Sequence, residues 1–312
     1  MYQDSHQSLN DVGVLVSSMA TTIALPYFAA DVPAALPLEA ERRASPDLVD
    51  NFKDRRIVGV GEHFVVKYGG HVNLLEGENL LFLREHTSVR GPRVYALYST
   101  ASKEGRPFYY IVMERIYAQT LVSLWPKLSD LEKKSIVATL RENLRQLRQL
   151  PPPAHYSSLG SRPLLHVLFD SNQPEFSNGG PFDDDDTLIE ALINRYVGDG
   201  GAPFRAEYLR RCLPRVFTSS GPTFSHCDFQ RKNILVDKRP KVESDGAGDS
   251  ELHVYVIDWE ASGWYPSYFE YCSAYLSLGR WADDWCLCLR DMLEPQDAQA
   301  EWFERLYIEM GY

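Results

Sequence analysis

The stretch TFSHCDFQRKNILV, residues 223–236, decides how the rest of this chain is interpreted. Within it, His226, Asp228 and Asn233 form the pattern H-x-D-x-x-x-x-N, directly before an apolar run. A second apolar strand follows further along the chain and is closed by Asp258. An aspartate, an asparagine five residues later and an aspartate at the end of the next strand are the layout of a kinase-type phosphoryl-transfer site. The pattern therefore predicts that Asp228 accepts the proton of an attacking hydroxyl, and that Asn233 and Asp258 hold magnesium.

A lysine in the first half of the chain fits the same chemistry. Lys67 lies in the apolar strand VVKYG, where an unpaired ammonium would be costly to bury. Contact with nucleotide phosphates and with a carboxylate on the following helix would explain its position. Glu76 and Glu78 are the candidates for that carboxylate, and Glu76 is preferred. A solvent-exposed strand lysine is the alternative.

Other residues near the motif have less specific roles. His226 is expected to bond the backbone of the loop rather than to act as a base, and Gln230 to shape the loop or touch phosphate. Trp264 and Tyr265 begin an aromatic cluster that could line the acceptor pocket and, with nearby acids, suit an amine. Packing of these rings in the core of the second lobe is the alternative.

The order of the predicted elements indicates an α+β fold. One helix is expected at 76–85, and strands are expected on either side of it at 57–60, 64–67, 94–98 and 108–113. Further helices are expected from residue 268 onward and at 130–150, 187–197 and 205–216. We therefore divide the chain into three parts. An N-terminal extension or flap spans 1–50, a sheet-based lobe with a hinge spans 51–119, and a helical lobe with the catalytic and metal-binding loops spans 120–312.

The bulk composition is that of an ordinary globular protein. The 312 residues are 44% hydrophobic and 24% charged, and the net charge is −11. This acidity argues against nucleic acid as the main ligand and favours a cationic or neutral substrate, although it could simply maintain solubility. Five cysteines without a C-x-x-C pair predict free thiols in a reducing compartment, and hence a cytoplasmic location, rather than disulfides or zinc. The first 24 residues lack the features of a signal peptide, and no membrane span is expected.

Rival catalytic motifs are missing from the sequence. It contains no G-x-x-x-x-G-K-[ST] and no G-x-S-x-G pattern. Gly59 and Gly61 form only a fragment of a glycine-rich loop, and a strand rather than a helix follows them. A dinucleotide-binding fold is therefore disfavoured.

The segments HCDFQRKNILV and VIDWEASGWYP resemble the aminoglycoside phosphotransferase and choline-kinase-like family of small-molecule kinases. VVKYG, EGENLLFLREHTSV and YIVMERI fit the same family in the same order, and the wording is most similar to its fungal phosphotransferase-enzyme branch. The resemblance implies a protein-kinase-like bilobal fold, with an antiparallel-sheet N-lobe that carries one helix, a mainly helical C-lobe, and ATP in the cleft between them. The segment 90–93 and Ala118 depart from the pattern of many relatives, and both are expected near the nucleotide.

Carried over position by position, the resemblance implies a role for each matching residue. Asp228 matches the base, and Asn233 and Asp258 match the magnesium ligands. Lys67 matches the phosphate-binding lysine, and Glu76 matches its partner on the helix. Met113 matches the residue that guards the adenine pocket, and Glu114 and Ile116 match the hinge residues whose backbone bonds adenine. Glu260 matches a residue that assists metal or substrate binding.

The sequence thus predicts an ATP- and Mg²⁺-dependent O-phosphotransferase that acts on a hydroxyl of a small molecule. A nucleotide-binding pseudokinase or scaffold is the first alternative. A protein kinase is the second, disfavoured because the segment from Asp258 to Pro266 is too short for a peptide-binding platform. The acceptor and the oligomeric state are left open.

Overall fold

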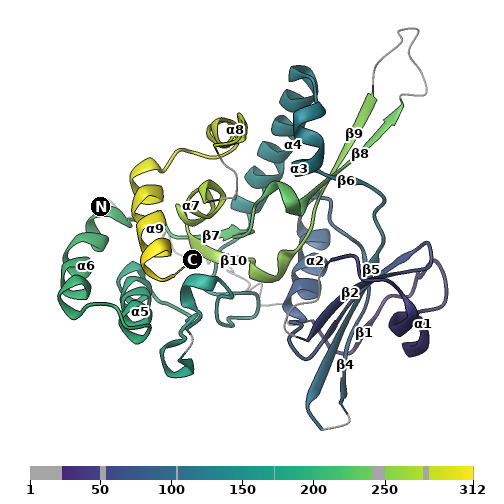
Figure 1. Cartoon of the computed structure of the whole chain (residues 1–312), viewed down its shortest axis with the longest axis horizontal. Coiled ribbons are helices and arrows are strands. Elements are labelled where there is room, and N and C mark those ends of the chain that lie inside the picture. The colour runs from purple at the N-terminus through teal and green to yellow at the C-terminus, as the bar shows by residue number, and fades with distance from the viewer. Residues whose placement is uncertain are drawn as a thin grey trace, which may run out of the picture.

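The computed structural model describes residues 23–49, 54–102, 105–171, 173–240, 250–276 and 281–311. An antiparallel sheet with one helix against it forms one lobe, and a larger, mainly helical lobe follows (Figure 1). The α+β arrangement predicted from the sequence is therefore confirmed.

The sheet of the first lobe has five antiparallel strands in the order β1-β4-β5-β3-β2. Its strands are β1 (Tyr27–Phe28), β2 (Arg55–Val60), β3 (Phe64–Gly69), β4 (Val94–Ala101) and β5 (Pro107–Glu114). Four of them are the predicted strands, lengthened at their ends. The short edge strand β1 was not predicted, because two residues are too few to show an alternating pattern.

The two faces of the sheet have different partners because side chains alternate along a strand. In β3, Phe64, Val66 and Tyr68 lie in a cluster on the outer face, whereas Lys67 lies on the opposite face. The helix α1 (Glu39–Ala44) helps to cover the outer face, where the buried Arg42 guanidinium lies 4.8 Å from the centre of the Tyr110 ring. The described part of the N-terminal segment therefore completes the outer layer of this lobe.

Helix α2 (Leu75–His86) lies between the sheet and the helical lobe (Figure 1). Gly77 faces Leu97 of β4 so closely that a β-carbon at this position would overlap the leucine side chain. On the other side, the amide of Asn79 donates to the carbonyl oxygen of Trp259 at 2.8 Å. One helix is thereby fixed to both lobes.

In its described residues, the helical lobe contains α3 to α9 and two small sheets. The helices are α3 (Leu121–Leu124), α4 (Asp130–Arg148), α5 (Asp185–Gly198), α6 (Pro203–Val216), α7 (Phe269–Tyr275), α8 (Trp285–Met292) and α9 (Asp297–Glu309). The small sheets pair β7 (Pro222–Ser225) with β10 (Gly263–Pro266), and β6 (Gln119–Thr120) with β8 (Ile234–Pro240) and β9 (Ser250–Val256). In Figure 1 the β8–β9 ribbon extends away from the body of the molecule.

Helix starts in this lobe follow from their capping residues. The Ser129 hydroxyl accepts from the Glu132 N–H, and the Ser129 N–H donates to the Glu132 carboxylate at 2.9 Å. Asp184 accepts from the Thr187 N–H at 2.8 Å, so α5 begins two residues before the predicted 187. Every helix in the described ranges is too short or too polar to cross a membrane.

We predict that Gly77→Ala destabilises the protein even though alanine favours helix more than glycine does. The new methyl group must displace the fully buried Leu97, and overpacking of this kind costs about 1–3 kcal/mol. Denaturant unfolding would measure the change. Glu85→Ala on the exposed side of the same helix is the matched control and should change the stability by less than about 0.5 kcal/mol. A gain in stability for Gly77→Ala would contradict the tight contact.

Candidate active site

Lys67 lies at the centre of a cluster of three carboxylates. Its ammonium nitrogen is 2.5 Å from Glu76 on α2, 3.1 Å from Asp258 and 2.9 Å from Glu260. Only 2% of the lysine side chain is exposed, so the ion pairs replace its hydration. Arg55 contributes a second cation from β2 and bonds Glu260 at 3.2 Å. Glu78, the other predicted partner, instead pairs with Arg162 at 2.7 Å.

The cluster shifts the pKa of Lys67, Glu76 and Asp258. Burial disfavours the charged Lys67, but attraction to Glu76, Asp258 and Glu260 outweighs burial and raises its pKa. Burial raises the pKa of Glu76 to about 7, helped by repulsion from the other two carboxylates and opposed by Lys67. Burial also acts on Asp258, but Lys67 outweighs it and lowers the pKa. Three carboxylates against one lysine and Arg55 leave an excess of negative charge that a bound cation could relieve.

Asp258 is held by an unusual backbone conformation. Its φ and ψ are 65° and 57°, in the left-handed region that aspartate tolerates better than most residues do. The preceding N–H, that of Ile257, donates to the carbonyl oxygen of Asn233 at 2.9 Å. The turn that carries Asp258 and the loop that carries Asp228 and Asn233 are therefore bonded to each other.

Both ring nitrogens of His226 are used in backbone hydrogen bonds. Nδ1 accepts from the N–H of Asp228 at 3.1 Å, and Nε2 donates to the carbonyl oxygen of Ile257 at 3.0 Å. The ring is fully buried and packs edge-on against Trp259. His226 therefore fixes the geometry of the loop, and neither nitrogen is left to take up a substrate proton.

The Asp228 carboxylate is oriented by its neighbours in the same loop. The amide of Gln230 donates to Oδ1 at 2.5 Å, and that of Asn233 donates to Oδ2 at 2.7 Å. The Lys232 ammonium lies 3.2 Å from Oδ2. The carboxylate is still 28% exposed, so it is held in place and accessible at once.

Glu270 on α7 supports this loop and was missed in the sequence analysis. Its buried carboxylate accepts the backbone N–H groups of His226 and Cys227, the second at 3.3 Å. Cys227 has a φ of 62°, so the chain turns sharply just before Asp228. Burial raises the pKa of Glu270, while its two backbone donors and His226 favour the charged form. A lone acid in the aromatic run YFEYC was the available signal, because an acid in a buried helix needs a partner.

The connection between the lobes follows β5. Met113 is buried and pairs with Val65, and Glu114 donates its N–H to the carbonyl oxygen of Arg93 at 2.8 Å. The N–H of Ile116 donates to no described residue. The predicted hinge residues therefore lie next to the strand that carries Lys67, with one backbone donor available.

A protein-family model described as the phosphotransferase enzyme family matches residues 74–304 of the chain. The chain belongs to this family. It is accordingly a small-molecule kinase, as the sequence resemblance predicted. A comparison with curated proteins finds no similar sequence.

Solved structures show the same fold. The GDP complex of aminoglycoside 2'-phosphotransferase-IIIa is 16% identical, with 87% of this chain and 85% of that chain covered and a TM-score of 0.55. The streptomycin–ATP complex of APH(2")-IIa is also 16% identical, with 85% and 86% covered and a TM-score of 0.50. The predicted protein-kinase-like fold is therefore confirmed for this phosphotransferase.

Two predicted substrate residues lie in the core of this phosphotransferase. Trp264 packs against Phe82 and Phe224, and Tyr265 is fully buried and donates its hydroxyl to the carbonyl oxygen of Ala261 at 2.7 Å. Neither side chain lines the cavity next to Asp228. Their rings therefore pack in the core, which was the alternative interpretation of the sequence.

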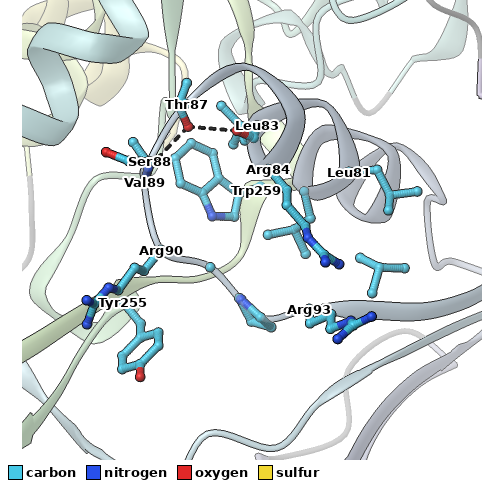
Figure 2. Close-up of a pocket in the computed structure, with 14 residues that line it drawn as sticks. Leu81, Leu83, Arg84, Thr87, Ser88, Val89, Arg90, Arg93, Tyr255 and Trp259 are labelled. Carbon is cyan, nitrogen blue, oxygen red and sulfur yellow. Dashed lines mark hydrogen bonds between the residues drawn. The ribbon is translucent and has the colours of Figure 1, made fainter. Parts of the chain in front are cut away.

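A separate cavity of about 370 Å³ lies behind α2, and Figure 2 shows the residues that line it. Segment 90–93, which departs from the pattern of relatives, forms part of its wall, and the carbonyl of Arg93 bonds the hinge from this side. Arg90 bonds His253, and Arg93 pairs with Asp31. No member of the Lys67 cluster lines this cavity. Segment 90–93 therefore contacts the hinge from outside the proposed catalytic centre.

The donor atoms at the proposed centre of this phosphotransferase fit a divalent cation that prefers oxygen. One ligand atom each from Glu76, Asp258 and Glu260 lies within 4.8 Å of the others. Asn233 is 5% exposed and uses only its amide nitrogen, so its oxygen has no partner among the described residues. Carboxylate and amide oxygens are the ligands that magnesium takes in proteins.

We predict that Glu270→Ala lowers the free energy of unfolding by about 2 kcal/mol or more, since two buried backbone N–H groups lose their acceptor. Glu270→Gln keeps an acceptor oxygen and should lose less. Chemical denaturation of the two variants would measure the difference, with the exposed Glu294→Ala as control. Equal stability of Glu270→Ala and the unmodified protein would exclude the supporting role of Glu270.

Proposed function

We propose that this protein transfers the γ-phosphoryl group of ATP to a hydroxyl of a small molecule. The observation that carries the proposal is the meeting of Lys67, Glu76 and Asp258 at a turn that is bonded to the Asp228 loop. These side chains come from both lobes, so together they could hold a nucleotide bound between the lobes. Membership of the phosphotransferase enzyme family supports the reaction class.

In this proposal Asp228 receives the proton of the acceptor hydroxyl. The bonds from Gln230 and Asn233 restrict the carboxylate to one orientation and leave part of it accessible. A base held in the right orientation needs no reorganisation when the hydroxyl arrives. His226 has no part in the proton transfer, because both of its ring nitrogens are bonded to the backbone.

Asn233 and Asp258 would hold magnesium, with Glu260 nearby to assist. Magnesium supplies positive charge against the phosphate oxygens. Glu76 keeps Lys67 charged and in place, and contact with the nucleotide phosphates would replace the bonds that the ammonium makes to Asp258 and Glu260. Met113 would border the adenine pocket, and the backbone of Glu114 and Ile116 would bond the base.

We predict that Asp228→Asn lowers the rate of acceptor phosphorylation by about 10²- to 10⁴-fold, the usual contribution of a general base. Binding of magnesium-ATP should persist, because the change removes no proposed nucleotide contact. Product formation and calorimetric titration with the nucleotide would give the two values. Asp291→Asn, on the exposed surface of α8, is the matched control. Turnover that is unchanged in Asp228→Asn would remove the assigned base.

Asp258→Asn tests the metal assignment, since asparagine also tolerates a left-handed backbone. We expect the magnesium concentration for half-maximal activity to rise at least about tenfold, because a charged oxygen ligand is lost. Binding of Mn²⁺, followed by its electron paramagnetic resonance signal, should weaken in parallel. A magnesium dependence that equals that of Asp291→Asn would argue against Asp258 as a ligand.

A further inference from the structure

A small cavity next to Asp228 has the position of an acceptor site. Its volume is about 190 Å³, and its walls come from the 165–167 segment, the Asp228 loop, α7 and α9. The space equals that of about six water molecules at roughly 30 Å³ each, well below the 300–1,000 Å³ of sites for drug-sized ligands. Only a compact group fits within it.

The walls of the cavity carry both apolar and polar groups, and more of the open surface is polar. Leu165, Val167, Leu276, Phe303 and Tyr307 contribute aliphatic and aromatic surface. Walls that are largely uncharged disfavour a ligand with an unpaired charge more than they disfavour a neutral ligand.

Among the described residues that line the cavity, Asp228 is the only charged one. Its carboxylate already lies 3.2 Å from the Lys232 ammonium. A ligand with several ammonium groups would therefore lose hydration without finding enough carboxylates to replace it. This balance disfavours polycations, including the streptomycin held by one structural relative.

One ring nitrogen of a buried histidine has no acceptor among the described residues. His166 lines the cavity and is 7% exposed. Its Nδ1 accepts from the N–H of Leu168 at 3.2 Å, which leaves the proton on Nε2, and no described residue accepts from that nitrogen. Burial lowers the pKa of His166 to about 3, so the ring is neutral at ordinary pH. It is therefore a donor of one hydrogen bond and not a base.

We propose that the acceptor is a compact, uncharged alcohol, and that His166 selects it by donating from Nε2 to a second oxygen of the molecule. The inference rests on the proposed function and names the substrate class of the same site. In the reaction, the alcohol oxygen forms a bond to the γ-phosphorus, the bond from that phosphorus to ADP breaks, and the alcohol proton goes to Asp228. The products are a phosphate monoester and ADP.

The full chain would be assayed with magnesium-ATP and two sets of acceptors, by ADP release and by mass spectrometry of the products. The first set contains neutral alcohols of about ten heavy atoms, with tyrosol and 2-phenylethanol as probes with and without a second oxygen. The second contains streptomycin and hygromycin B. We expect esters of neutral alcohols, with kcat/KM at least 100-fold above that for either aminoglycoside.

Three outcomes separate the two proposals. Preferential phosphorylation of the aminoglycosides would overturn the substrate class and keep the kinase assignment. Hydrolysis of ATP without an ester of any neutral alcohol would do the same. No consumption of ATP with or without any acceptor would instead count against the proposed function itself.

His166→Phe tests the selecting residue, because phenylalanine keeps the ring and removes the donor. We expect the KM for the best neutral alcohol to rise about tenfold or more, with a smaller change in kcat. The ratio should be the same at pH 6 and pH 9, because a neutral donor does not titrate there. His166→Gln restores an N–H donor and should recover part of the affinity, and His155→Phe, outside the cavity, should change nothing. An unchanged KM in His166→Phe, or a loss that varies with pH, would overturn this role.

Discussion

The buried ammonium of Lys67 is the constraint on which the proposed centre depends. It is almost completely removed from water, so its charge is tolerable only if carboxylates surround it. Glu76 comes from α2, and Asp258 and Glu260 come from the turn after β9, so these two segments and β3 meet at one point. Because the acids outnumber the nearby cations, the same arrangement that stabilises the lysine leaves charge for a metal ion. The atoms that meet this structural need are also those proposed to meet the catalytic one.

The second part of the centre is organised through the backbone. Glu270 accepts two main-chain N–H groups at the turn before Asp228, and His226 joins that turn to the carbonyl that precedes Asp258. Neither residue needs to touch a substrate to matter. They fix the direction of the chain, and the left-handed conformation of Cys227 gives the sharp turn just before Asp228. The position of Asp228 therefore depends on α7, a helix more than thirty residues further along the sequence.

Elements with a strong periodic pattern were predictable from the sequence, and so were the members of the proposed centre. The apolar strand around Lys67 indicated that its ammonium needs a partner, and the five-residue spacing indicated that Asn233 lies close to Asp228. Features that depend on contacts between distant segments were not predictable. The β7–β10 pair has only four residues in each strand, and Glu270 carries no motif of its own. That Nε2 of His166 has no acceptor among the described residues could be seen only from the structure, in which α9 forms part of the cavity wall.

The attachment of α2 has a consequence for how the protein responds to stress. Its Glu76 binds the sheet, while Glu78 and Asn79, one turn or less away, bind Arg162 and Trp259 of the other lobe. If either lobe unfolded, a buried charge or amide in the other lobe would lose its partner. The free energies of the two lobes are thus coupled, and heat or denaturant should act on them as one cooperative unit, although the sequence reads as two blocks of different composition.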